Sequence, residues 1–291
     1  METILDDEFV IQMDDTPPFS WIRQTPNRFM TCNVGRKLDS VAISAIGTPL
    51  IFAEMARDII GGERIKIRNP FSLSPDETNC LITYSGEVRG AIAALKETTN
   101  KGIVISSGGA IKSVARSKGW DYIPLPKGYA ARFLLPEILG CMLTLFGRGF
   151  ESTDLESFLE QNAPSEITSE NVSKQIALRL SGRSPVIFYD ELSAGLANYF
   201  LTNLKTNAGL EANIVSVEGG KEHTSKADAN TVPVSFLSQG SPKDALNIGG
   251  FPYDCSTADG YVKNAVIAQM SSLYLGLLRA HEIELLDNNI E

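Results

Sequence analysis

A chain of 291 residues with 43% apolar and 21% charged residues has a globular composition and is long enough for one large domain or two ordinary ones. Its formal net charge of −9 argues against nucleic acid or an anionic membrane as a partner. No apolar run reaches membrane-spanning length, and the acidic N-terminus is unlike a signal peptide, so we expect a cytoplasmic protein. Four scattered cysteines and only two histidines argue against a disulfide framework and against a His/Cys metal site.

The first ordered elements follow an irregular, proline-interrupted arm over residues 1–35. Val41–Ile46 is typical of a buried strand. In Gly47-Thr48-Pro49, which comes next, Thr48 suits a helix N-cap and Pro49 the first helical position. The helix continues to Gly61-Gly62, and Arg64–Arg68 alternates in the manner of a more exposed strand. A turn with glycine and a hydroxyl therefore joins the first strand to its helix.

The segment Cys80–Gly109 repeats this order and is the clearest pattern in the chain. A short β-prone run ends at Ser85-Gly86, and apolar residues then recur with helical spacing at Val88, Ala91, Ile92 and Leu95. A second apolar run, Ile103–Ile105, closes on Ser106-Ser107-Gly108-Gly109. This order predicts a parallel βαβ unit.

Ser85-Gly86 therefore falls between the carboxyl end of a strand and the start of a helix, where open α/β sheets bind ligands. Unpaired backbone N–H groups and the helix dipole favour an anion there, and a hydroxyl adds a donor. The alternative is that Ser85 only caps the helix, a common role for serine.

The next elements complete the first half of the chain. A short helix contains Ile111, Tyr122–Leu125 is a strand, and Phe133–Phe146 is a strongly apolar helix. Arg132 stands immediately before that helix, where a positive charge opposes the dipole. A functional role beside the candidate anion site and a merely solvated side chain are equally weighted alternatives. Residues 147–170 are predicted to be a polar connection, which divides the chain into domains 1–150 and 151–291.

The second half repeats the alternation loosely. The predicted elements are strands at Pro185–Tyr189 and Thr231–Leu237, a helix after Asp190 and a long terminal helix over Val262–Ala280. A polar segment, Val217–Lys226, holds one of the two histidines, His223, beside the carboxylate of Glu222. Such segments are usually solvated loops, but this pair of groups is also typical of general acid–base sites.

These pieces, in this order, resemble the archaeal-type bifunctional phosphoglucose/phosphomannose isomerases of the sugar isomerase (SIS) domain family. The resemblance is clearest over residues 40–146 and weaker to about residue 280. Thr83-Tyr84-Ser85-Gly86 is similar to the family's Ser-Tyr-Ser-Gly-Asn-Thr phosphate loop, and Ser106–Gly109 to its next strand end. Gly47-Thr48 stands at the family's Gly-Gly-Ser turn, Ala131-Arg132 at its Pro-Arg, and Lys221-Glu222-His223 near its His-Asn-Glu.

The resemblance implies an α/β fold of two SIS subdomains, each a three-layer αβα sandwich around a mainly parallel sheet, and a homodimer that shares its active sites. It also implies interconversion of glucose 6-phosphate and/or mannose 6-phosphate with fructose 6-phosphate, without metal or other cofactor. The phosphate would be held by Gly47, Thr48, Thr83, Ser85 and Gly86. Glu222 would be the base, Arg132 would stabilise the enediolate, and His223 or His281 would have to open the sugar ring.

Several departures from the family pattern bear on turnover. Val88 replaces the last hydroxyl of the phosphate loop, and Glu87 adds a carboxylate where the family has a neutral residue. The family's ring-opening histidine has no counterpart in Ser238–Lys243, and its catalytic lysine has none after Arg279. A phosphosugar-binding protein without turnover is therefore the alternative. A dinucleotide-dependent enzyme is a weak third, since no Gly-x-Gly-x-x-Gly follows the first strand.

Overall fold

The computed structural model describes residues 3–29, 37–69, 71–217, 230–237 and 253–287. The chain forms two compact units, which we name the inserted unit (Thr25–Glu151) and the host unit (Met1–Gln24 with Ser152–Glu291). This division differs from the expected ranges of 1–150 and 151–291 at the N-terminus, because the first 24 residues group with the second half of the chain.

The inserted unit is built on a five-stranded sheet in which every neighbouring pair is parallel. Its strands are β1 (Val41–Ala45), β2 (Ile65–Arg68), β3 (Asn79–Ile82), β4 (Gly102–Ser106) and β5 (Asp121–Pro124), in the order β2-β1-β3-β4-β5. β1, β3 and β4 are buried along their whole length, as expected for parallel strands covered on both faces. The predicted βαβ unit is confirmed.

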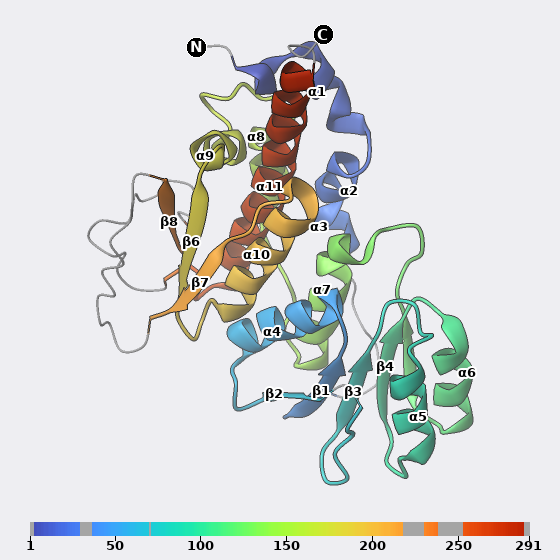
Figure 1. Ribbon diagram of the computed structural model, residues 1–291. Coiled ribbons are helices and arrows are strands. Elements are labelled where there is room, and N and C mark those ends of the chain that lie inside the picture. The colour runs from blue at the N-terminus through green and yellow to red at the C-terminus, as the bar shows by residue number, and fades with distance from the viewer. Residues whose placement is uncertain (1–2, 30–36, 70, 218–229, 238–252, 288–291) are drawn as a thin grey trace. The chain divides into compact units, whose positions relative to one another are not determined.

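Helices cover both faces of this sheet. They are α3 (Thr25–Arg28), α4 (Thr48–Ile60), α5 (Arg89–Glu97), α6 (Gly109–Ser117), the 3₁₀ helix η3 (Ala131–Phe133) and α7 (Leu135–Leu145). α4 leads from β1 to β2 at one edge of the sheet, whereas α5 leads from β3 to β4 and α6 from β4 to β5, toward the other edge. Since such crossovers are right-handed, α4 and the α5/α6 pair cover opposite faces. α7 packs against α4, and α5 against α6 (Figure 1).

One hydrophobic cluster shows why α5 and α6 form where they do. It comprises Leu81, Ala91, Leu95, Val104, Ile111, Ala115 and Trp120, all buried. The members from α5 and α6 recur with helical spacing, so each helix presents one apolar stripe to the sheet. The predicted periodicity from Val88 to Leu95 is thus confirmed.

The host unit contains a smaller parallel sheet and the long helix α11. Its strands are β6 (Ser184–Tyr189), β7 (Asn213–Ser216) and β8 (Thr231–Ser235), in the order β7-β6-β8. Its helices are η1 (Ile4–Asp6), α1 (Glu8–Gln12), η2 (Met13–Asp15), α2 (Phe19–Arg23), α8 (Leu155–Gln161), α9 (Val172–Leu180), α10 (Ala194–Ala208) and α11 (Ala258–Asp287). The residues expected to form an irregular arm are therefore a run of short helices. Two parallel sheets flanked by helices confirm the α/β class.

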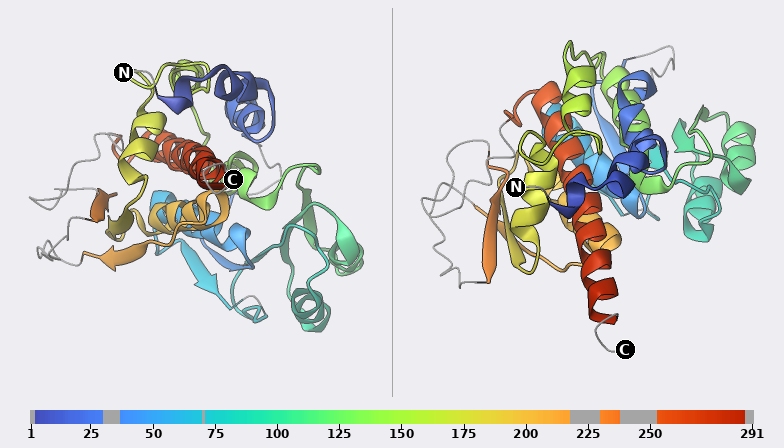
Figure 2. Two further views of the ribbon diagram at one scale, coloured as in Figure 1. Left: turned by 45° about the horizontal axis from the view of Figure 1, so that its top comes forward. Right: turned by 90° about the horizontal axis from the view of Figure 1, so that it is seen from above.

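The helix α11 packs against both α9 and α10, and Figure 2 shows it running between them. Its residues from Gly260 to Ser272 are buried without interruption. A helix enclosed on every side needs no polar face, and this stretch buries apolar residues together with Asn264, Gln269, Ser271 and Ser272. The one long cation in this stretch, Lys263, pairs with Asp154 and Asp259 at 2.7 Å each.

A buried lysine holds the N-terminal segment to the rest of the host unit. The Lys174 Nζ donates to the carbonyl oxygens of Leu5, Pro164 and Glu166 and lies 3.3 Å from the Asp6 carboxylate. Burial lowers the pKa of Lys174, and Asp6 opposes that shift. Asp6 also accepts hydrogen bonds from the backbone and hydroxyl of Thr168. A buried ammonium group must be satisfied in this way, so Lys174 fixes where residues 5 and 6 dock.

Two further expectations concern membranes and cysteines. Along the described part of the chain, no helix combines the length and apolar character needed to cross a membrane. The sequence argued against a disulfide framework, but Cys141 in α7 is disulfide-bonded, whereas Cys80 and Cys255 carry buried thiols. Spacing along the sequence does not show which cysteines a fold brings together.

Candidate functional site

The strand order of the inserted unit reverses between β1 and β3, and the candidate site lies at this reversal. The two strands pair in parallel with Ala45 opposite Ile82. The turns that follow them, Gly47-Thr48 and Thr83–Gly86, therefore leave the same edge of the sheet side by side. In open α/β sheets, ligands bind at the carboxyl ends of the strands at such a switch point. The structure thus brings together all five residues predicted to bind phosphate.

The turn after β3 presents Ser85 to solvent. Thr83 is buried and its N–H donates to the Ile105 carbonyl at 3.1 Å, whereas Ser85 is exposed. The Ser85 Oγ accepts from the Glu87 N–H at 3.2 Å, which leaves its own proton available for a ligand oxygen. α5 begins only at Arg89, so the alternative in which Ser85 caps that helix is wrong.

This turn packs against the turn after β4 with no space for side chains. A Cβ on Gly86, whose φ is +70°, would lie 1.9 Å from the Gly108 carbonyl oxygen. A Cβ on Gly109 would lie 2.4 Å from the Ser85 carbonyl oxygen. The Ile111 N–H donates to the Gly86 carbonyl at 3.0 Å. These contacts fix the turn, so its donors need little reorganisation to meet a ligand.

The turn after β1 supplies the second half of the site. Gly47 has φ +68° and precedes α4, so the helix begins at Thr48, one residue earlier than the capping pattern predicts. No side chain caps this helix start, and Thr48 is half-buried. The first N–H groups of a helix have no partners within the helix, and they favour an anion.

The carboxylate of Glu87 is held at the neighbouring helix. Its Oε1 accepts from the Ala110 N–H at 2.9 Å, in the first turn of α6. A carboxylate is favourable at a helix N-terminus. Glu87 therefore has a structural partner, but its negative charge still lies in the turn that would bind an anion.

Arg132 lies in η3, which packs against α4, the helix that begins at Thr48. Its side chain is half-buried, and its guanidinium carbon lies 4.9 Å from the centre of the Phe133 ring. The remaining predicted catalytic residues, Glu222 and His223, fall outside the described residues, as does Ser238–Lys243. Their roles stay predictions.

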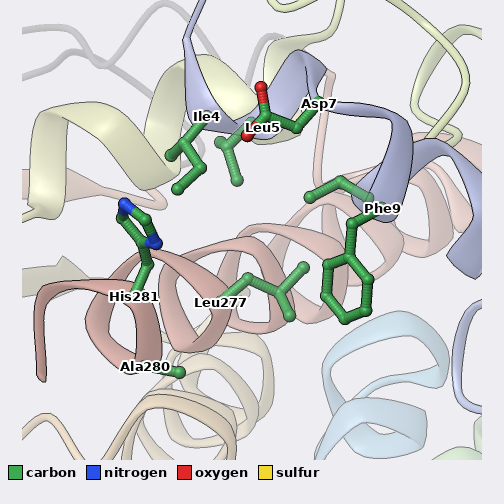
Figure 3. A pocket seen from close by; sticks show the side chains of 8 residues that line it. Ile4, Leu5, Asp7, Phe9, Leu277, Ala280 and His281 are labelled. Carbon is green, nitrogen blue, oxygen red and sulfur yellow. The ribbon is translucent and has the colours of Figure 1, made fainter. Parts of the chain in front are cut away.

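His281 lies on α11 in the host unit and lines a cavity of about 220 Å³. Figure 3 shows it beside Leu277 on the same helix, with Ile4, Leu5 and Phe9 across the cavity. Most of these neighbours are apolar. Among the described residues that line the cavity, Asp7 and His281 alone carry polar side chains, fewer than would orient a sugar.

No sequence pattern indicates the buried ion pair between Arg28 and Glu137. The Arg28 Nε and Nη2 donate to the two Glu137 carboxylate oxygens at 2.7 and 2.9 Å. Burial raises the pKa of Glu137, and the Arg28 guanidinium opposes that shift. The pair lines an open depression of about 690 Å³ with Tyr129 and the residues that follow β5. Neither residue belongs to a motif, so only the fold shows that they meet.

No family model matches this chain. The chain is 28% identical over 180 residues to D-glucosamine-6-phosphate 4-epimerase of Sulfolobus acidocaldarius. The match covers 58% of this chain and 58% of that protein. The chain is 27% identical over 130 residues to the bifunctional phosphoglucose/phosphomannose isomerase of Aquifex aeolicus, 44% of this chain and 40% of that protein. The matched region thus spans less than two thirds of the length of either relative.

Solved structures agree on the fold over nearly the whole chain. A glucose-6-phosphate isomerase like protein from Thermus thermophilus superposes with a TM-score of 0.61 at 15% identity, covering 94% of this chain and 93% of that one. Tagatose-6-phosphate ketose/aldose isomerase from Escherichia coli superposes with a TM-score of 0.57 at 16% identity, covering 95% of this chain and 92% of that one. At such identities the likeness shows the fold alone.

Proposed function

We propose that this chain binds a hexose 6-phosphate at the β1–β3 switch point and isomerises it between aldose and ketose. The observation that carries the proposal is the adjacency of the Thr48 and Ser85 turns at the end of β1 and β3. The names of the two relatives support it, since one is an isomerase and the other an epimerase of hexose 6-phosphates. Glucose 6-phosphate and mannose 6-phosphate are the proposed aldoses, and fructose 6-phosphate is the ketose.

The two turns would hold the phosphate through hydroxyl and backbone donors. The chain as a whole carries a net charge of −9, so the attraction for a dianion must be local. At the start of α4, Pro49 has no N–H and the Leu50 N–H donates to the Gly47 carbonyl. The local donors are therefore the Thr48 N–H and the hydroxyls of Thr48 and Ser85. Anchoring at the phosphate leaves the binding energy available for orienting the reacting carbons.

The chemical step is a proton transfer between neighbouring carbons. A base removes the C2 proton of the open-chain aldose, and the electron pair forms an enediolate. The proton returns to C1 while the C2 hydroxyl proton passes to the C1 oxygen, so that the C2 oxygen becomes the ketose carbonyl and the C1 oxygen a hydroxyl. Following the resemblance, we assign the base to Glu222 and stabilisation of the enediolate oxygen to Arg132. His223 is our candidate for ring opening.

Two alternatives have specific support. The relative with 28% identity is a 4-epimerase of glucosamine 6-phosphate, which favours a test of that substrate. The negative charge of Glu87 in the phosphate turn, and the valine at position 88, favour a binding protein without turnover.

One experiment separates these three functions. The protein is incubated in D₂O with glucose 6-phosphate, mannose 6-phosphate or glucosamine 6-phosphate, and the sugars are followed by proton NMR. Loss of the C2 proton signal with formation of fructose 6-phosphate supports the isomerase. A new product differing at C4 supports the epimerase. Binding measured by calorimetry without either change supports the binding protein, and no binding of any of the three sugars contradicts the proposal.

A further inference from the structure

Arg28 lies beside the segment that contains Arg132 and forms a buried ion pair with Glu137. The side chains of Arg28 and Glu137 are only 9% and 3% exposed. The pair is bidentate, which fixes the orientation of the guanidinium plane. A buried ion pair gives little net stability over an apolar pair of the same volume, so stability alone is a weak reason for it.

Arg28 also makes two contacts with the segment that precedes α7. Its Nη2 donates to the Phe133 carbonyl oxygen, and its guanidinium carbon lies 4.1 Å from the centre of the Tyr129 ring. Phe133 is the residue next to Arg132. One guanidinium therefore fixes both ends of the segment 129–133 that contains Arg132.

The same segment is tied to the phosphate turn. The Tyr84 hydroxyl donates to the Tyr129 carbonyl oxygen at 2.6 Å. Tyr84 directly precedes Ser85, and its own carbonyl accepts from the Ser107 hydroxyl at 2.6 Å. A continuous path of contacts within the inserted unit thus joins the turn of Ser85 to the segment of Arg132.

We propose that Arg28 and Glu137 are positioning residues that hold the Arg132 segment in register with the Ser85 turn. This rests on the proposed function, in which Ser85 binds the phosphate and Arg132 meets the enediolate oxygen at the other end of the substrate. The chain of atoms between the phosphate and the reacting carbons limits how far apart these two ends of the substrate can lie. The two protein groups must then be held at a matching separation, and small displacements are costly in turnover.

The test measures the contribution of Arg132 to the binding of a negative charge, so that it does not depend on turnover. Arabinonate 5-phosphate has a carboxylate where the enediolate would form, and arabinitol 5-phosphate has a neutral hydroxyl there. Calorimetry gives the affinity for each compound. The ratio of the affinity for arabinonate 5-phosphate to that for arabinitol 5-phosphate reports how well the protein binds the negative charge. We expect Arg132→Met to lower this ratio by about 10-fold or more, since a charged hydrogen bond contributes about 1.5–3 kcal/mol and 1.4 kcal/mol is tenfold.

The decisive variant is Arg28→Lys, alone and combined with Arg132→Met. Lysine cannot form the bidentate pair, reach Phe133 and stack on Tyr129 at once. We expect Arg28→Lys to lower the ratio several-fold in the wild-type background, and to leave it unchanged in the Arg132→Met background. An equal fall in both backgrounds, or no fall in the first, overturns the inference.

Controls separate positioning from loss of structure. Arg64→Lys changes another arginine of the same unit that stacks on a ring, Phe146, and donates to backbone carbonyls, and it should leave the ratio unchanged. Where Arg28→Lys unfolds, Tyr84→Phe removes a single hydroxyl of the same path and should lower the ratio in the same background-dependent way. If wild-type protein binds neither sugar phosphate, the proposed function fails and this inference with it.

Discussion

Gly86 and Gly108 approach so closely that a Cβ on Gly86 would lie 1.9 Å from the Gly108 carbonyl oxygen. The turn after β3 therefore takes its shape from its neighbour after β4. The backbones of these two βα turns are in direct contact, and this contact keeps Ser85 in a fixed place at the edge of the sheet.

We expect Gly86→Ala to abolish sugar-phosphate binding and to destabilise the protein. The positive φ alone costs about 1–3 kcal/mol for a residue with a side chain, and the overlap with Gly108 forces the two turns apart. Thermal unfolding and calorimetry with glucose 6-phosphate measure both effects. Gly62→Ala is the matched control, because a Cβ there meets nothing within 4 Å. Normal binding by Gly86→Ala would show that the turn is not part of the site.

Ser85→Ala should weaken glucose 6-phosphate binding by about 1.5–3 kcal/mol, the contribution of a hydrogen bond to a charged group. Its stability should change little, because Ser85 is exposed and does not cap α5. The comparison is Ser117→Ala, which removes an exposed hydroxyl at the other end of α6. A loss of stability without a loss of affinity would mean that the hydroxyl serves the turn and not a ligand.

Glu87→Gln should strengthen phosphate binding. The amide oxygen can still accept from the Ala110 N–H, but the negative charge beside the bound dianion is removed. For an exposed charge we expect a gain of about 0.2–1 kcal/mol that shrinks as salt is added. Glu97→Gln, an exposed residue near the end of α5, removes the same charge further away. Equal gains from both variants would point to the global charge instead.

Lys174→Met should destabilise the host unit by roughly 3 kcal/mol, the lower end for breaking a buried charged pair. The variant leaves three carbonyl oxygens and the Asp6 carboxylate without their shared donor. Chemical denaturation measures the loss, and amide hydrogen exchange should show faster exchange in η1 and α1. Lys205→Met, at a lysine whose side chain is 72% exposed, should change neither quantity.

Glu77 gives a pH dependence whose direction can be worked out. Its hydrogen bond from Lys66, with a further one from Arg68, lowers its pKa from 4.5 to about 2. A folded-state pKa below the unfolded one stabilises the protein above pH 4.5, and this stabilisation is lost as the pH falls from 4.5 to 2. Glu77→Gln should therefore lower stability at pH 7 and make no difference near pH 2. A constant difference between the two proteins across this range would contradict the assignment.

The strands and turns of the inserted unit could be predicted because their signals are local. Buried parallel strands are continuous apolar runs, and Ser85-Gly86 and Gly47-Thr48 mark where two of them end. The βαβ pattern predicts the pairing of β3 with β4, whereas the pairing of β1 with β3 is shown by the structure. The helix starts were misplaced by one residue at Thr48 and by more at Ser85, since a capping residue type does not show which donor it meets.

Other features could not be predicted, because they depend on contacts between distant residues. Arg28 and Glu137 are 109 positions apart, and neither stands in a recognisable pattern. In the sequence, Lys174 is indistinguishable from the exposed charged residues of an amphipathic helix, yet in the structure it is fully buried. The short N-terminal helices have too few residues for a periodic signal, so their acidic and proline-rich segment looked irregular.

The interrupted host unit has a consequence for biosynthesis. Asp6 and Lys174 are separated by 168 positions, and all of Thr25–Glu151 lies between them. During translation the inserted unit is complete once residue 151 has left the ribosome, whereas the first 24 residues still lack the surface on which they dock. The residues synthesised first are therefore expected to be among the last to reach their native place. Until then, the apolar side chains of Leu5, Val10, Phe19 and Ile22 are exposed to chaperones.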